Sequence, residues 1–187
     1  MKTSTLRALA LATVLGASAL ATASYAANPM VGGSPMLPTK NIIENALNSK
    51  DHTTLVAAVK AAGLVATLEG KGPFTVLAPT NEAFAALPAG TVDNLLKPAN
   101  KAMLVKILTC HVIPAKALST DIMAMAKAGG GTHEVTTVGG CKLILKATGG
   151  KVTITDETGG VANVTIADVI QSNGVIHVID KVLLPKK

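Results

Sequence analysis

The sequence predicts an α+β fold, with helices in the first part of the chain and short strands in the second. Between residues 41 and 127, apolar residues recur with the spacing of a buried helical face. From Gly129 onward the pattern changes to short alternating or β-branched runs, separated by the glycine pairs 149–150 and 159–160. A further apolar strand at 74–79 lies far upstream of these runs, and we expect it to enter the same sheet.

Residues 1–26 have the pattern of a cleavable secretory signal peptide. Lys2 and Arg7 precede an apolar stretch at 8–21, and small residues then surround a cleavage site after Ala26. The stretch is shorter than the roughly 18 to 20 residues of a membrane-spanning helix. We therefore expect export to the periplasm or the cell exterior, without membrane insertion after cleavage.

The remaining chain is expected to form an N-terminal arm followed by one domain. Residues 27–40 are rich in Pro and Gly and show no periodicity, which indicates a linker or arm. Residues 41–187 have the length of a single domain with one hydrophobic core.

Helices are expected where apolar residues form a stripe and a capping residue begins or ends it. Gly63, for example, is a good stop for a helix that begins near Thr53. Ser119 or Thr120 can likewise cap the last helix. The expected helices cover about 41–47, 53–62, 64–68, 91–96, 100–109 and 119–127, and the strands after them cover 134–138, 142–146, 151–155 and 163–167.

The segment around 74–84 predicts a strand, a sharp turn and a helix. Its apolar run is rich in strand-forming residues, and Pro79 cannot donate to a β-ladder, so the strand is expected to stop there. Thr80 or Asn81 can then cap a helix that buries Phe84. Both polar residues are fully explained as caps or turn residues.

Composition excludes some classes of partner. The net charge of +6 falls to +4 when Lys2 and Arg7 are removed, and the remaining lysines are scattered, with 142, 146 and 151 the nearest to a cluster. After removal of residues 1–26, the aromatic residues are Phe74 and Phe84. A solvated surface is therefore favoured over nucleic-acid binding, for which stacking platforms are missing.

Cys110 and Cys141 are the two cysteines of the chain. An even number of cysteines in an exported chain favours a disulfide, which stabilises such a loop by roughly 3 to 4 kcal/mol in the chain-entropy model. The alternative is two buried thiols that never meet.

Two segments together identify a family. The segment 74–84 reads FTVLAPTNEAF, and the segment 173–185 reads NGVIHVIDKVLLP, in which a turn precedes a β-branched strand. They resemble the two signature boxes of the fasciclin (FAS1) domain, and the resemblance covers nearly all of 41–185. Among members of this family, the chain resembles bacterial secreted single-domain proteins in particular. It implies a wedge of two small β-sheets with several helices packed on one side.

The resemblance also implies roles for individual residues. The segment 108–113 is similar to the middle motif of the family, with Cys110 in the place of an aromatic residue. In that motif His111 is structural, and its ring bonds to nearby backbone. In the second box the family places adhesion determinants, so Asn173, His177 and Asp180 are expected to be the surface residues that bind a partner.

No catalytic or cofactor-binding motif is recognisable, and the family has no common catalytic centre. We found no nucleophile elbow, phosphate-binding loop or close pair of zinc ligands. Met30 and Met36 lie in the arm and could offer thioethers to Cu(I). The alternative, which we favoured, is that both methionines dock the arm onto the domain.

The expected function is therefore non-catalytic adhesion or interaction, without a cofactor. The expected partner is a cell-surface, extracellular-matrix or envelope protein or polysaccharide. The alternative is a periplasmic small-ligand or copper-binding protein that uses Met30 and Met36.

Overall fold

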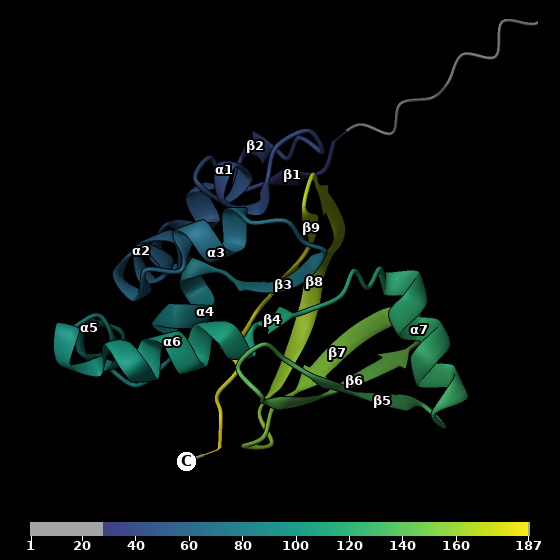
Figure 1. The fold of residues 1–187 in the computed structure, drawn as a ribbon. Coiled ribbons are helices and arrows are strands. Elements are labelled where there is room, and N and C mark those ends of the chain that lie inside the picture. Colours follow the sequence, from purple (N-terminus) through teal and green to yellow (C-terminus); the bar gives the residue numbers. More distant parts are fainter. Residues whose placement is uncertain (1–27, 187) are drawn as a thin grey trace, which may run out of the picture.

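A computed structural model describes residues 28–186 and confirms the α+β class. The helices α1, α4 and α6 contact the sheet at β9, β3 and β4, respectively, whereas α7 packs on β5, β6 and β7 (Figure 1). In chain order the elements are β1 (Met30–Val31), β2 (Ser34–Pro35), α1 (Ile42–Ala46), η1 (Lys50–His52), α2 (Thr53–Ala62), α3 (Val65–Glu69), β3 (Phe74–Pro79), α4 (Asn81–Ala85), α5 (Thr91–Leu95), η2 (Pro98–Asn100), α6 (Lys101–Cys110), β4 (Val112–Ile113), α7 (Ser119–Ala128), β5 (Thr132–Thr136), β6 (Lys142–Thr148), β7 (Lys151–Thr155), β8 (Val161–Gln171) and β9 (Gly174–Ile179).

The sheet has the strand order β4-β3-β9-β8-β7-β6-β5. Its two parts share β8, which pairs with β9 at one end and with β7 at the other. Register shifts at Val164/Ile166 and Ile166/Val169 interrupt the β8–β9 ladder, and such bulges bend a strand. The two small sheets of the predicted wedge are therefore the two parts of one seven-stranded sheet, which is bent at β8.

Two groups of buried side chains fill the two sides of this wedge. The larger group lies between the sheet and the helices α1 to α6, and includes Leu55, Val59 and Phe84. The smaller group lies under α7, where Ile122 packs with the inward residues of β6 and β7, such as Leu145. The alternation of buried and exposed residues along β6 and β7 follows from this arrangement, because only one face of each strand is covered.

The N-terminal arm is more ordered than expected. Residues 30–35 form a short β1–β2 hairpin instead of an unstructured linker, and Met36 is 2% exposed. Asn45 of α1 holds the arm, because its side chain accepts from the Leu37 N–H at 3.0 Å and donates to the Leu37 carbonyl at 2.8 Å. The burial of Met36 agrees with docking of this residue, whereas Met30 is 57% exposed, and the copper alternative stays a prediction.

The other predicted elements are present, and two strands differ clearly in their ends. The strand expected at 134–138 is β5 at 132–136. The last strand before β9 was expected at 163–167, whereas β8 extends over 161–171. Asp168 interrupts the alternation inside β8 and has φ of 58°, and a polar residue there resembles a strand end in the sequence. The first 27 residues, including the predicted signal peptide and cleavage site, lie outside the described part of the chain.

Candidate functional site: the hollow at the Asn173 turn

The centre of the sheet joins the two signature boxes. Strand β3 pairs in parallel with β9, so that Phe74 lies beside Gly174 and Leu77 beside His177. The contact is close at the start of both strands: a Cβ atom on Gly174 would lie 2.1 Å from the Phe74 carbonyl oxygen. A glycine is needed there because any side chain would collide with backbone. The parallel pairing thus fixes where the β8–β9 turn emerges.

Asn173 ties this turn to the helical layer. Its side-chain oxygen accepts from the Ile42 N–H at 3.1 Å, and its amide donates to the carbonyls of Leu68 at 2.7 Å and Gly70 at 3.0 Å. The neighbouring Ser172 N–H donates to the Lys40 carbonyl at 2.9 Å. One side chain therefore connects the start of α1, the end of α3 and the sheet, which makes the turn rigid.

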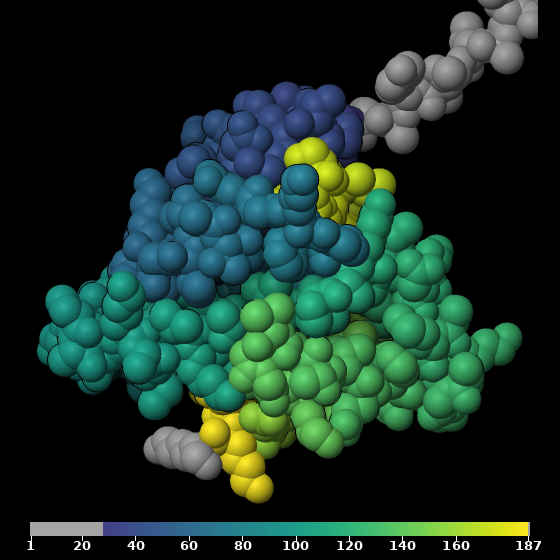
Figure 2. Space-filling view, in the orientation of Figure 1, coloured from purple at the N-terminus to yellow at the C-terminus, as the bar shows by residue number. Residues whose placement is uncertain are grey.

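A surface hollow of about 510 Å³ opens beside this turn. Its floor includes Asn173 and Gly174, and the exposed side chains of Glu69, Lys71 and Lys116 stand at its rim. Figure 2 shows the turn, in yellow, at the surface beside the purple and blue N-terminal segments. The hollow has a rigid polar floor and a rim with two positive charges and one negative charge, which suits recognition of a polar partner more than chemistry on a substrate.

The other two candidates of the second box do not lie at this hollow. His177 is 1% exposed, so the expectation of a surface histidine was wrong. Strand β9 is buried along its whole length, and a polar residue within it is held by internal bonds. Asp180 is half-buried at the other end of β9, where its carboxylate accepts from the backbone and the side-chain amide of Asn163, both at 2.7 Å.

Ser119, Asp168 and His177 lie close together but do not form a catalytic triad. The Asp168 carboxylate accepts from the backbone N–H and the hydroxyl of Ser119, not from the imidazole. The Nδ1 atom of His177 accepts from the Asp168 N–H at 3.2 Å, and Nε2 donates to the Ala117 carbonyl at 2.8 Å. Burial lowers the pKa of His177. Both ring nitrogens are occupied by backbone, so this imidazole cannot accept a proton from the serine.

Thr80 and Asn81 make the local bonds of capping and turn residues. The Thr80 hydroxyl accepts from the Ala83 N–H at 3.3 Å and so caps α4. Asn81 connects α4 to α2, because its side-chain oxygen accepts from the Thr54 N–H at 3.0 Å and its amide donates to the Lys50 carbonyl at 2.8 Å.

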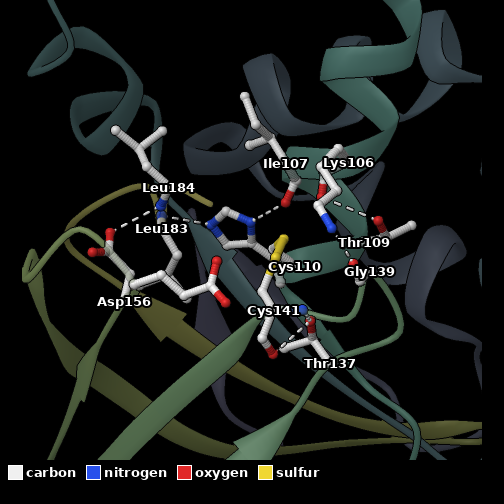
Figure 3. Close-up of a disulfide and its surroundings, with 12 residues drawn as sticks. Lys106, Ile107, Thr109, Cys110, Thr137, Gly139, Cys141, Asp156, Leu183 and Leu184 are labelled. Atoms are coloured by element: carbon white, nitrogen blue, oxygen red, sulfur yellow. Dashed lines mark hydrogen bonds between the residues drawn. A yellow bond between two sulfur atoms is a disulfide. The ribbon is translucent and has the colours of Figure 1, made fainter. Parts of the chain in front are cut away.

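His111 joins α6 to the C-terminal segment. Its Nδ1 donates to the Ile107 carbonyl at 2.8 Å, and its Nε2 accepts from the Leu183 N–H at 2.9 Å. Beside it, Cys110 and Cys141 form a disulfide that links the end of α6 to the start of β6 (Figure 3). Complete burial of the His111 ring lowers its pKa to about 4, although the Ile107 carbonyl partly opposes that shift.

His52 is a further buried histidine, and its role is not visible in the sequence. Its Nδ1 lies 2.8 Å from the Ser49 hydroxyl, whereas its Nε2 has no partner in hydrogen-bond geometry among residues 28–186. Burial lowers its pKa, and the Ala78 carbonyl offsets part of the shift. The ring borders an apolar cavity of about 70 Å³ beneath α1 and α2.

Of the residues around the hollow, sequence reasoning singled out Asn173, whose role in binding stays a prediction, and missed the others. Lys71 and Lys116 lie in segments without a motif, about 45 residues apart in sequence, and only the fold brings them to one rim. Asn45 was also missed, although an asparagine within the apolar stripe of α1 is a signal for a buried hydrogen bond. Within the described residues, no group of three or more His, Cys, Asp and Glu side chains is arranged to hold a metal ion.

The fold and the paired boxes define a FAS1 domain, and comparison with known proteins agrees. The sequence matches the family described as Fasciclin domain over residues 50–185, so the chain belongs to the fasciclin family. A FAS1 domain pair from the insect cell adhesion molecule Fasciclin I is similar in structure, with a TM-score of 0.70 at 18% identity, over 78% of this chain and 51% of that chain.

Relatives in sequence come from bacteria and animals. Protein sll1483 of Synechocystis is 51% identical over 77% of this chain and 73% of its own length. Immunogenic protein MPB70 of Mycobacterium bovis is 33% identical over 75% and 66%, respectively. Transforming growth factor-beta-induced protein ig-h3 of Sus scrofa is 35% identical over 79% of this chain but only 20% of its own length. Across residues 28–186, none of the helices combines the length and the hydropathy required to cross a bilayer.

Proposed function

We propose that this protein is an exported, non-catalytic interaction module that attaches to a cell-surface, matrix or envelope partner through the hollow at the Asn173 turn. The observation that carries the proposal is the rigid polar floor that Asn173 makes beside an open, charged rim. A partner that docks there meets a surface that is already ordered, so binding costs little conformational entropy.

The structural neighbour supports the same class of function. Fasciclin I is an insect cell adhesion molecule, and its FAS1 pair shares this fold. The arrangement of the polar side chains also favours binding over catalysis, because the buried histidines are held by internal bonds and the exposed charged groups lie at the rim. The signal-peptide pattern of residues 1–26 supports the export that this proposal requires.

A binding experiment with rim variants tests the proposal. Beads coated with the processed chain are incubated with cell-envelope material, and the retained protein and sugar are quantified. Lys71→Gln with Lys116→Gln removes two rim charges from exposed positions and is expected to reduce retention several-fold while the melting midpoint stays unchanged.

The control is Lys50→Gln with Lys97→Gln, which removes the same charge from exposed positions away from the hollow. It should retain partner at the wild-type level. Equal retention by the rim variant and the control would contradict the assignment of the hollow. Asn173→Ala serves only as a stability variant, because it removes three internal hydrogen bonds.

A further inference from the structure

A second surface lies on the uncovered face of strands β5 to β8. In this part of the sheet α7 covers one face, and the side chains on the opposite face are exposed. The ladder places Thr132, Lys146, Thr153 and Asn163 in one row across the four strands. Because neighbouring strands lie about 4.8 Å apart, such a row spans roughly 14 Å on a nearly flat surface. We refer to all residues of β5 to β8 on the face opposite α7, in this row and its neighbours, as the threonine face.

A second row of the threonine face is partly aliphatic. It consists of Glu134, Ile144, Thr155 and Val161, in register across the same four strands. Ile144 and Val161 are each 42% exposed, which is high for such side chains in a sheet. The face therefore offers hydroxyl groups in both rows and two separate aliphatic side chains, Ile144 and Val161, on either side of Thr155.

The charges of this face are positive on balance. Lys142, Lys146 and Lys151 lie on it, against the single carboxylate of Glu134, which gives a net charge of +2. Glu134 forms an ion pair with Lys142, with 3.0 Å between Nζ and Oε1. At the border of the face, the Asp180 carboxylate accepts two hydrogen bonds from Asn163 and adds one negative charge, so the face with its border has a net charge of +1. Lys146 and Lys151 are therefore the ammonium groups that can meet an external anion.

We propose that the threonine face binds an acidic polysaccharide, which lies across the strands with its carboxylates at Lys146 and Lys151. Threonine hydroxyl groups suit the hydroxyl groups of a sugar, and the aliphatic side chains of Ile144 and Val161, on either side of Thr155, suit its C–H groups. The residues of the face include no aromatic ring, so stacking cannot provide the affinity, and a neutral glycan is disfavoured. The same observation disfavours single-stranded nucleic acid.

This inference deepens the proposed function and rests on it in one respect, namely that the exported chain meets envelope or matrix polymers. The two can fail separately because the surfaces are different. The hollow lies at the Asn173 turn, and the threonine face uses strands β5 to β8.

The test uses affinity electrophoresis of the processed chain in gels that contain polygalacturonate, its methyl-esterified form, or dextran. We expect retardation by polygalacturonate alone, which weakens as ionic strength rises to about 0.15 M. Lys146→Gln with Lys151→Gln should weaken binding about three- to tenfold, as expected for the loss of two exposed charge pairs. Thr153→Val should weaken it without a change in net charge.

Two variants with the same change in net charge serve as controls. Lys50→Gln with Lys97→Gln and the rim variant Lys71→Gln with Lys116→Gln should both keep near-wild-type retardation. If either lowers binding as much as the Lys146/Lys151 change, general charge and not the threonine face is responsible, and the proposal is wrong. Absence of retardation by polygalacturonate, or equal retardation by dextran, would also overturn it. Equal envelope retention by the rim variant and its control would contradict the hollow but leave this proposal standing.

Discussion

Acid should destabilise the folded chain through its buried histidines, and His111 makes the largest contribution that can be quantified. Burial lowers the pKa of His111 from 6.5 to about 4. Because the folded pKa lies below the unfolded one, the unfolded chain binds more protons between these two values. The free energy of unfolding is therefore complete above about pH 6.5 and falls as the pH is lowered towards 4.

The size of this effect follows from the shift. One pKa unit corresponds to about 1.4 kcal/mol, so a shift of roughly 2.5 units makes His111 responsible for a loss of about 3 kcal/mol over the whole window. That loss is a large share of the roughly 5 to 15 kcal/mol that stabilises a typical domain. Burial lowers the pKa values of His52 and His177 as well, which adds to the loss in the same direction.

Urea unfolding at several pH values from about 7 to about 4.5 measures this slope. The chain has no Trp and its one Tyr is Tyr25, so circular dichroism is a better signal than fluorescence. This window avoids Glu157: the backbone N–H groups of Lys142 and Lys186 lower its pKa, so its contribution is present above the ordinary carboxyl range and is lost only in stronger acid.

A variant isolates His111 from the other titrating groups. His111→Gln keeps a donor and an acceptor but does not titrate, so it should start at lower stability and lose about 1.4 kcal/mol less per pH unit than the wild type. His133→Gln removes an imidazole that is only half-buried on β5 and is the control. Equal slopes for the wild type and His111→Gln would refute the reasoning.

Three further predictions concern stability. Reduction of the Cys110–Cys141 disulfide, or its replacement by serines, should cost about 4 kcal/mol for a separation of 31 residues and lower the melting midpoint by about 10 °C in calorimetry; an unchanged midpoint would contradict this. Val59→Ile should fill part of the 70 Å³ cavity and raise the free energy of unfolding by about 0.5 to 1 kcal/mol, and a decrease would show that the cavity walls cannot accept a methyl group. Gly174→Ala should destabilise by about 1 to 3 kcal/mol in urea, since the added Cβ would collide with the Phe74 carbonyl, and wild-type stability would exclude that close contact.

Local signals in the sequence were sufficient for most of the fold. The helix at 53–62 ends at Gly63, which has φ of 75° in the structure, and Thr80 caps α4 as its position after Pro79 indicated. These features depend on neighbours within one helical turn, so a single sequence contains the required information. The sequence predicted that the strand at 74–79 enters the sheet, but not that β3 pairs in parallel with β9, because no local signal connects strands a hundred residues apart.

The features that could not be predicted depend on contacts between distant residues. The arm was expected to be a linker, because the bonds of Asn45 with Leu37 and Gln171 are invisible to periodicity. His177 was expected at the surface because the family places adhesion determinants in the second box, but β9 lies in the middle of the sheet and is buried along its whole length. A strand of this kind shows no alternation of apolar and polar residues, so the sequence contains no measure of its exposure.

The same contrast indicates where recognition resides in this protein. The polar side chains of the signature boxes are bonded internally: Asn173 to the helical layer, His177 to the backbone near α7, and Asp180 to Asn163. Groups that are used in this way set the shape of the domain and have little capacity left for a partner. Binding then falls to exposed residues next to the boxes or on the threonine face, such as Lys116 and Lys146, which belong to no motif. Relatives that share both boxes can therefore share this scaffold and still bind different partners, and exchanging those lysines should change what the domain binds without changing how it folds.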